Sequence, residues 1–184
     1  MTRNKANDVL KMVLTALFAA LICVATMLVQ VPAPVTGGYA NLGDGVILMG
    51  AFLLHPLYAV IAAGLGSMLA DMLAGYMAYA PATLMIKALM AGAASLIYIR
   101  FGKAKKPGEA IQWMVIAGFA AESIMVLGYF FYEAVIMGFG AAGASASVLT
   151  NVGQGAVGIA VACVTAPLLM RNSEVKSLMN KTWK

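Results

Sequence analysis

The sequence predicts an all-α integral membrane protein, a bundle of six helices in which the second helix is short. Hydrophobic residues make up 62% of the 184 residues, only 10% are charged, and the mean hydropathy is +0.90. Soluble domains carry about 25% charged residues. A helix needs roughly 20 mainly apolar residues to cross a bilayer, so five or six fit here with short connections. We therefore expect residues 1–184 to form a single transmembrane domain.

The distribution of lysine and arginine predicts the topology. Eleven of the twelve fall in three clusters, which are Arg3, Lys5 and Lys11, then Arg100, Lys103, Lys105 and Lys106, then Arg171, Lys176, Lys181 and Lys184. The segments PVTGGYANLGD, GYMAYAP and GFGAAGASAS between them contain neither residue type. Because cytoplasmic loops retain Lys and Arg, we expect both termini in the cytoplasm, which requires an even number of spans.

The apolar runs set the expected boundaries of the six helices. These are residues 9–31, 43–55, 57–75, 82–101, 111–138 and 146–170. The second run is too short to cross the bilayer, so we expect the chain to turn back at His55-Pro56 while neighbouring helices shield it. The first run lacks a convincing cleavage site and is interpreted as a retained span rather than a signal peptide.

Ionisable residues within the expected spans are the strongest indication of function. They are Asp44, Asp71, Lys87, Glu122 and Glu133. A charge at the bilayer centre costs roughly 2.5–3.5 kcal/mol on insertion scales, so such residues normally face a cavity or one another. Glu122, Tyr129 and Glu133 share one helical face at i, i+7 and i+11. Asn151 and Gln154 share another at i and i+3.

These polar groups predict a pocket that is open to the outside, with Lys87 paired to one carboxylate. Structural alternatives stay open for several of them. Tyrosines near helix ends can form an interfacial belt, and Glu133 can simply face outer water. Asp44 and Asp71 can cap a helix or pair with Lys87. The amides of Asn151 and Gln154 can hydrogen-bond between helices.

Other classes of protein fit the sequence less well. An enzyme would need a nucleophile with a base, or a set of metal ligands. The one histidine, His55, is expected at the inner face, and Cys23 and Cys163 are interpreted as buried thiols, so we expect no catalytic residue, metal or cofactor. The clustering of the +5 net charge argues against nucleic acid. A self-sufficient secondary transporter would show paired repeats, and a purely structural subunit would not explain the converging polar residues.

The run GGYANLGDGVILMGAFLLHPLYAVIAAGLGSMLADMLAGYMAYAPATLMIKALMAG resembles the substrate-binding S components of energy-coupling factor (ECF) vitamin transporters. AAESIMVLGYFFYEAV and NVGQGAVG look like the fifth and sixth helices of that family, so the resemblance covers nearly the whole chain. It implies a six-helix protein of the bacterial cell membrane that binds one water-soluble vitamin or precursor from outside. Such proteins dock on a transmembrane coupling subunit and two ATP-binding subunits. The chain is most similar to the branch assigned to pyridoxine-type vitamin B6 or hydroxymethylpyrimidine.

The resemblance also implies roles for particular residues. The docking motif AxxxA of the first helix matches Ala16 and Ala20, where small residues allow close helix approach; packing within the bundle is the alternative. The loop Pro32–Leu42 covers the pocket in such proteins, and Gly37-Gly38 supplies the backbone freedom of a lid. The expected ligand contacts are Tyr39, Asn41, Asp71, Lys87, Glu122, Tyr129, Glu133, Asn151 and Gln154.

Overall fold

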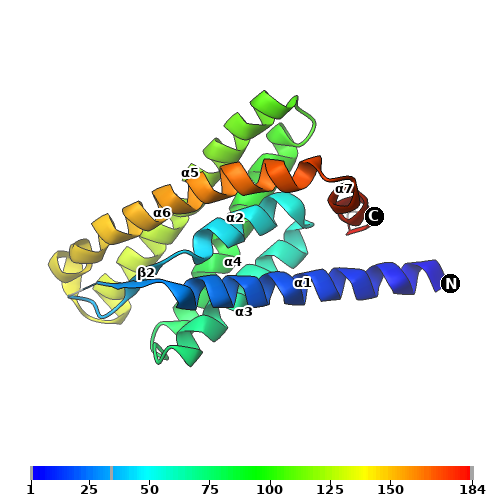
Figure 1. Ribbon diagram of the computed structural model, residues 1–184. Coiled ribbons are helices and arrows are strands. Elements are labelled where there is room, and N and C mark those ends of the chain that lie inside the picture. Colours follow the sequence, from blue (N-terminus) through cyan, green and yellow to red (C-terminus); the bar gives the residue numbers. More distant parts are fainter. Residues whose placement is uncertain (1, 34, 183–184) are drawn as a thin grey trace.

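The structure is a computed structural model that describes residues 2–33 and 35–182 (Figure 1). Pro34, within the expected lid, and Lys184, in the third basic cluster, lie outside the described residues, as does the side chain of Arg3. The α-helices are α1 (Thr2–Leu28), α2 (Gly43–Leu53), α3 (Pro56–Leu73), α4 (Ala80–Ile97), α5 (Pro107–Phe131), α6 (Gly140–Arg171) and α7 (Ser173–Thr182). Two π-helical turns, η1 (Tyr98–Gly102) and η2 (Tyr132–Ile136), extend α4 and α5. Two short strands, β1 (Gln30–Pro32) and β2 (Tyr39–Asn41), follow α1.

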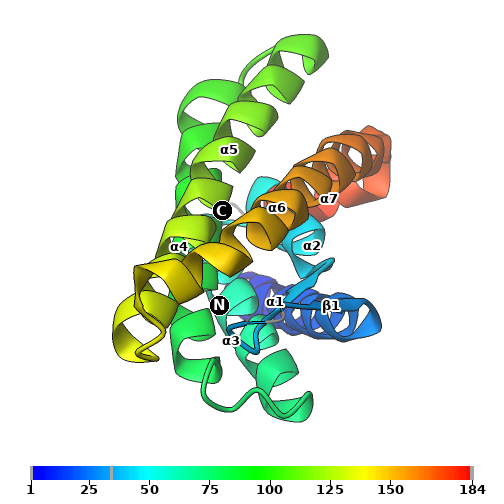
Figure 2. The ribbon, with the colours of Figure 1, turned by 90° about the vertical axis from the view of Figure 1, so that its left-hand side faces the viewer.

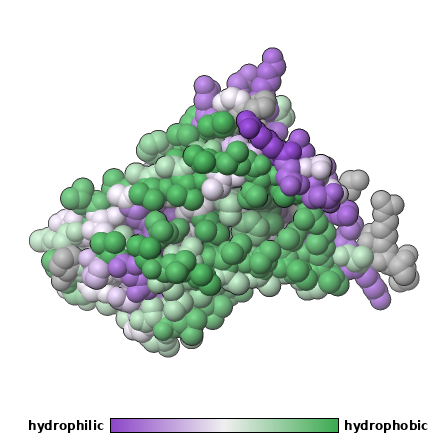
Figure 3. Space-filling view, in the orientation of Figure 1, coloured by the Kyte–Doolittle hydropathy of each residue, from purple (hydrophilic) through white to green (hydrophobic). Residues whose placement is uncertain are grey.

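Five of the described helical segments are long and apolar enough to cross a membrane. They are Lys5–Leu28, Pro56–Leu73, Ala80–Gly102, Gly108–Ile136 and Gly140–Arg171. Large apolar side chains point away from the bundle along them, as at Phe119 and Leu149, which are 64% and 81% exposed. Figure 3 shows hydrophobic residues over most of one face, with hydrophilic residues concentrated towards the end that carries the termini. The chain is therefore a multi-pass membrane protein.

Proline residues mark the starts of three helices. Pro56 is the first residue of α3, Pro81 is the second residue of α4, and α5 begins at Pro107. Proline suits these positions because the first helical N–H groups have no partner within the helix. His55 is extended, with φ −63° and ψ 143°, as the residue before a proline prefers. The expected turn at His55-Pro56 is confirmed.

The short helix α2 occupies the centre of the bundle. It contacts α1, α3, α4 and α6, and nine of its 11 residues are buried. Figure 2 shows α5 and α6 diverging from the turn that joins them, and in Figure 1 this turn lies at the end away from the termini. Because α2 is enclosed on several sides, its first turn brings Asp44 into the interior, 0% exposed.

The described residues contain seven α-helices rather than the six predicted. The additional helix, α7, begins after Asn172, whose Oδ1 accepts a hydrogen bond of 2.8 Å from the backbone N–H of Glu174. Val175 and Met179 of α7 pack against the core. Its sequence, SEVKSLMNKT, is too polar to be recognised from an apolar run.

Close helix packing depends on glycine where α1 crosses α3. A Cβ atom on Gly66 would lie 2.5 Å from the backbone oxygen of Ala19, and backbone cannot move away cheaply. We predict that Gly66→Ala lowers the free energy of unfolding in detergent by about 1–3 kcal/mol, the usual cost of overpacking. Gly153→Ala on α6 is the matched control, because a Cβ there meets nothing within 4 Å. Equal stability of the two variants would contradict the prediction.

Candidate ligand-binding site

The loop after α1 forms a β-hairpin, residues 30–33 and 35–41, which we call the hairpin. Its strands are antiparallel, with Gln30 opposite Asn41 and Pro32 opposite Tyr39. Gly37 has φ +68°, which glycine adopts readily and other residues rarely do. A Cβ on Gly38 would lie 3.3 Å from the hydroxyl of Tyr79. The two glycines thus serve different needs, one for conformation and one for close approach.

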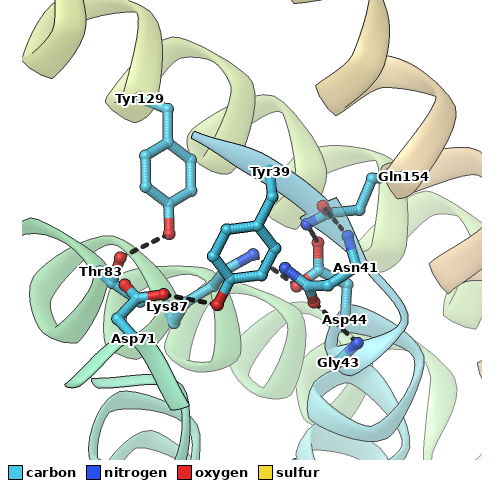
Figure 4. Close-up of polar contacts among 9 residues, drawn as sticks. All are labelled: Tyr39, Asn41, Gly43, Asp44, Asp71, Thr83, Lys87, Tyr129 and Gln154. Carbon is cyan, nitrogen blue, oxygen red and sulfur yellow. Dashed lines mark hydrogen bonds and ion pairs between the residues drawn. The ribbon is translucent and has the colours of Figure 1, made fainter. Parts of the chain in front are cut away.

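Beneath the hairpin, α2, α4 and α6 meet at a buried ion pair (Figure 4). Lys87 Nζ lies 2.5 Å from Asp44 Oδ1, and the Gln154 amide donates to Asp44 Oδ2 over 2.5 Å. Asp44 lies in the first turn of α2, where the helix dipole favours a negative charge. Gln154 Oε1 in turn accepts a hydrogen bond of 2.7 Å from the backbone N–H of Asn41. One amide therefore connects the ion pair to the hairpin.

Aromatic and hydroxyl groups form one wall of the site. The Tyr39 hydroxyl donates to Asp71 Oδ1 over 2.7 Å, and the Thr83 and Tyr129 hydroxyls are 2.9 Å apart. Lys87 Nζ lies 5.5 Å from the centre of the Tyr129 ring, within the range of a cation–π interaction. Figure 4 shows Tyr39 lying between the side chains of α4 and those near Gln154. Tyr39 thus fastens the hairpin to α3.

The tip of the hairpin is held by Tyr79 and Glu133. The Tyr79 hydroxyl lies 2.8 Å from the Thr36 carbonyl oxygen and 3.2 Å from Glu133 Oε1, and the Ser147 hydroxyl donates to Glu133 Oε2. Glu133 belongs to the π-turn η2, a distortion often found at functional sites. Burial, and to a lesser degree the nearby Glu133, raises the pKa of Tyr79 to about 12. Burial, followed by Asp71, also raises the pKa of Tyr39, so both hydroxyls keep their protons at neutral pH.

These groups surround a small and largely polar pocket. Its lining residues are Thr26, Ala33, Gly38, Tyr39, Asn41, Ser67, Asp71, Tyr79, Thr83, Lys87, Tyr129, Glu133, Ser147, Asn151 and Gln154. The free volume is about 30 Å³, enough for about two water molecules. Ser67 Oγ and Asp71 Oδ2 are buried without a hydrogen-bond partner among the described residues. Buried polar atoms are normally paired, so these two can receive hydrogen bonds from a ligand.

Eight of the nine predicted ligand contacts line this pocket. The ninth, Glu122, lies behind Asp44 and instead lines a groove between α5 and α6. Lys87 is paired with a carboxylate as expected. Seven lining residues were not among the predicted contacts, namely Thr26, Ala33, Gly38, Ser67, Tyr79, Thr83 and Ser147. The spacing i, i+4 from Ser67 to Asp71 and from Thr83 to Lys87 could have revealed Ser67 and Thr83.

Two further sets of residues have defined places. Ala16 and Ala20 are both exposed on α1, so they do not pack within the bundle. Cys23 and Cys163 are partly buried free thiols. Among the residues that the structure describes, no three of His, Cys, Asp and Glu are placed to hold a metal ion.

The ion pair allows a quantitative test of the site's stability. We predict that Lys87→Met lowers the free energy of unfolding by about 3–5 kcal/mol, because it leaves Asp44 buried and unpaired. Adding Asp44→Asn should restore part of the loss. The exposed pair Lys105–Glu109, 3.6 Å apart, is the control, and Lys105→Met should cost at most about 1 kcal/mol. Denaturant unfolding in detergent measures all three variants; equal losses at Lys87 and Lys105 would refute the prediction.

Comparisons with known proteins agree with this architecture. A relative from Pyrococcus woesei, described as "Uncharacterized protein in gap 3'region", is 37% identical over 141 residues, which are 76% of this chain and 88% of the relative. The solved structure described as "Structure and mechanism of the S component of a bacterial ECF transporter" matches with a TM-score of 0.65, over 88% of this chain and 95% of that one. At 17% identity that match shows a shared fold. Residues 6–171 match the family model described as "ECF-type riboflavin transporter, S component", and the chain therefore belongs to this family of transporter S components.

Proposed function

We propose that this S component binds a compact, hydroxylated heteroaromatic vitamin or precursor, of the pyridoxine or hydroxymethylpyrimidine type, and delivers it to an ECF module. The observation that carries the proposal is the pocket beneath the hairpin, which is small and rich in hydroxyl, carboxylate and amide groups. Both ligand types have a single aromatic ring with hydroxymethyl substituents and ring nitrogen atoms. Such a ligand needs several hydrogen bonds and little apolar contact, as this lining offers.

The groups in the pocket can be matched to such a ligand. Asp71 Oδ2 and Ser67 Oγ, which have no partner among the described residues, are available to ligand hydroxyl or ring N–H groups. Lys87, whose ammonium group has three donor hydrogens, and the Tyr129 hydroxyl can donate to ring nitrogen or hydroxyl oxygen. The Tyr39 and Tyr76 rings, with centroids 4.4 Å apart, offer an aromatic surface beside Asp71.

Riboflavin is the second candidate, because the description of the matching family model names it. A single-ring ligand already exceeds the pocket's free volume of about 30 Å³, and the three fused rings and ribityl chain of riboflavin exceed it by much more. Binding would require a larger displacement of the hairpin than a single-ring ligand demands. The two candidates therefore differ in size and in the movement that they require.

A binding experiment separates these candidates. We expect the purified chain to bind pyridoxine or hydroxymethylpyrimidine one to one without ATP in isothermal titration, and more tightly than riboflavin. Asp71→Asn and Gln154→Leu should each weaken binding tenfold or more, since an unpaired buried polar group costs about 1–3 kcal/mol. Glu109→Gln, at an exposed position, is the control. If riboflavin binds more tightly, riboflavin becomes the proposed ligand. If none of the three compounds binds, the proposed function is rejected.

The proposed orientation places the hairpin outside and all three basic clusters in the cytoplasm. In Figure 1 the N and C termini lie at the end opposite the hairpin, as this topology requires. In a background without Cys23 and Cys163, we expect cysteines at Val35 and Met77 to react with an impermeant thiol reagent added to whole cells. Both positions are exposed. A cysteine at the exposed Lys105 should not react, and the reverse pattern would invert the topology.

Docking to the coupling subunit is proposed to use the small exposed residues of α1. Leucine at Ala16 and Ala20 would add bulk where a partner helix must approach closely. We expect the double variant Ala16→Leu/Ala20→Leu to keep its ligand affinity and to lose ATP-driven uptake when it is reconstituted with the coupling and ATP-binding subunits. Normal uptake would place the docking face elsewhere. Uptake by the isolated wild-type chain on an ion gradient alone would favour a secondary transporter.

A further inference from the structure

Glu122 is a buried carboxyl group in the middle of the membrane-spanning bundle. It lies 14 residues from each end of the span Gly108–Ile136 and is 5% exposed. Its side chain packs into a notch formed by two glycines of α6. A Cβ on Gly155 would lie 3.0 Å from Glu122 Cγ, and one on Gly158 would lie 3.0 Å from both Glu122 Oε1 and Asp44 Cβ. Glu122 and Asp44 therefore both lie against the same glycine of α6.

In the part of the chain that the structure describes, no hydrogen-bond donor is directed at Glu122. Neither of its carboxyl oxygens has a partner among the described residues. The nearby donors, Lys87 Nζ and the Gln154 amide, are both directed at the oxygens of Asp44. On its other side lies a groove of about 350 Å³ between α5 and α6, lined mainly by apolar side chains such as Phe119 and Ile159. Glu122 thus lies between a carboxylate and an apolar surface.

The charges around Glu122 come from two other helices. Asp44 lies on α2 and Lys87 on α4, and together they are neutral. From α6, Glu122 meets Gly155 and Gly158, and Gln154, which precedes the first of them in the sequence, is uncharged. The next titratable residue outward on α5 is Tyr129, seven positions further on. An ionised Glu122 would therefore add an uncompensated negative charge in a buried site, which is strongly unfavourable.

We propose that Glu122 holds a proton at neutral pH and donates it in a hydrogen bond to Asp44, which makes Glu122 a positioning residue for the Asp44–Lys87 pair and, through Gln154, for the hairpin. Two ionised carboxylates have only acceptor oxygens and repel each other. One proton between them converts the contact into a hydrogen bond. The proton also leaves Lys87 and Gln154 free to bind Asp44 alone.

Loss of this proton would affect the hairpin through a defined sequence of contacts. An ionised Glu122 would compete with Asp44 for Lys87 Nζ and for the Gln154 amide. If that amide turns towards Glu122, Gln154 Oε1 no longer accepts from the backbone N–H of Asn41. The hairpin then keeps its contacts through Tyr39 and Tyr79, whose raised pKa values preserve those hydrogen bonds in mildly alkaline solution. Alkaline pH would loosen the hairpin at Asn41 first.

The first test needs no ligand and so does not depend on the proposed function. Infrared spectra of the purified wild-type protein at neutral pH should contain the carbonyl stretch of a buried carboxylic acid. Glu122→Gln should abolish this band, and Glu109→Gln should leave it unchanged. Asp44→Asn should shift its frequency, because the acceptor of the hydrogen bond changes. Identical spectra of the wild type and Glu122→Gln in this region would overturn the proposal, as would a band that Asp44→Asn does not move.

The second test follows affinity against pH, and this consequence rests on the proposed function. The probe is whichever of pyridoxine, hydroxymethylpyrimidine and riboflavin binds the wild type. We expect wild-type affinity to fall tenfold or more towards alkaline pH, whereas the Glu122→Gln variant should lose this dependence because its amide cannot ionise. Comparing both proteins with the same probe removes the titration of the probe itself. Glu122→Leu should bind weakly at every pH. If the affinity of Glu122→Gln falls in the same way towards alkaline pH, the positioning role of Glu122 is overturned. If the wild type binds none of the probes, the proposed function is rejected, and the infrared test alone decides whether Glu122 holds a proton.

Discussion

The buried ion pair between Asp44 and Lys87 is the interaction on which the rest of the site depends. An ammonium and a carboxylate removed from water are costly, and they are tolerated only when the pair is close and its remaining atoms are hydrogen-bonded. Here the distance is 2.5 Å and Gln154 occupies the second carboxylate oxygen. Asp44 comes from α2, Lys87 from α4 and Gln154 from α6. These contacts therefore fix the three helices relative to one another.

The position of α2 follows from the same constraint. An 11-residue helix cannot cross the bilayer, so it is stable within the membrane only where other helices shield its ends. Enclosure by α1, α3, α4 and α6 gives that protection and also buries Asp44 at its first turn. Small residues permit such close packing, as the contact of Gly66 with the backbone of Ala19 shows. The polar site and the apolar packing are therefore parts of one arrangement.

The hairpin covers a polar pocket within an otherwise apolar bundle, and three separate contacts hold it there. Tyr39 binds Asp71, the backbone of Asn41 binds Gln154, and Tyr79 lies against the tip. Each contact involves a single hydroxyl or amide, which is individually weak and can be exchanged for a ligand group. Breaking these contacts would not require any helix to unfold. Two glycines at its tip provide the conformation and the close approach that such a short hairpin needs.

Much of the fold could be predicted from the sequence because membrane helices depend on local properties. Apolar length located the spans, His55-Pro56 marked the turn after the second helix, and the short apolar run of residues 43–55 predicted a helix that does not cross. The resemblance to S components was confirmed at the level of the family, while its pyridoxine or hydroxymethylpyrimidine branch remains a proposal. The helix α7 was missed because a polar amphipathic segment leaves no apolar run to recognise.

The sequence by itself determined which helical faces are polar, and this is why six of the seven expected ligand contacts on helices line one pocket. Helical periodicity fixes where a residue lies around its own axis, but it says nothing about how that helix is rotated against its neighbours. Only the tertiary structure therefore decided that Asp44 is the partner of Lys87, and that Glu122, on the same helix as Tyr129, lies behind this pair rather than in the pocket. The pairing of charges in a membrane protein depends on distances between helices, and those arise from packing that no single segment encodes.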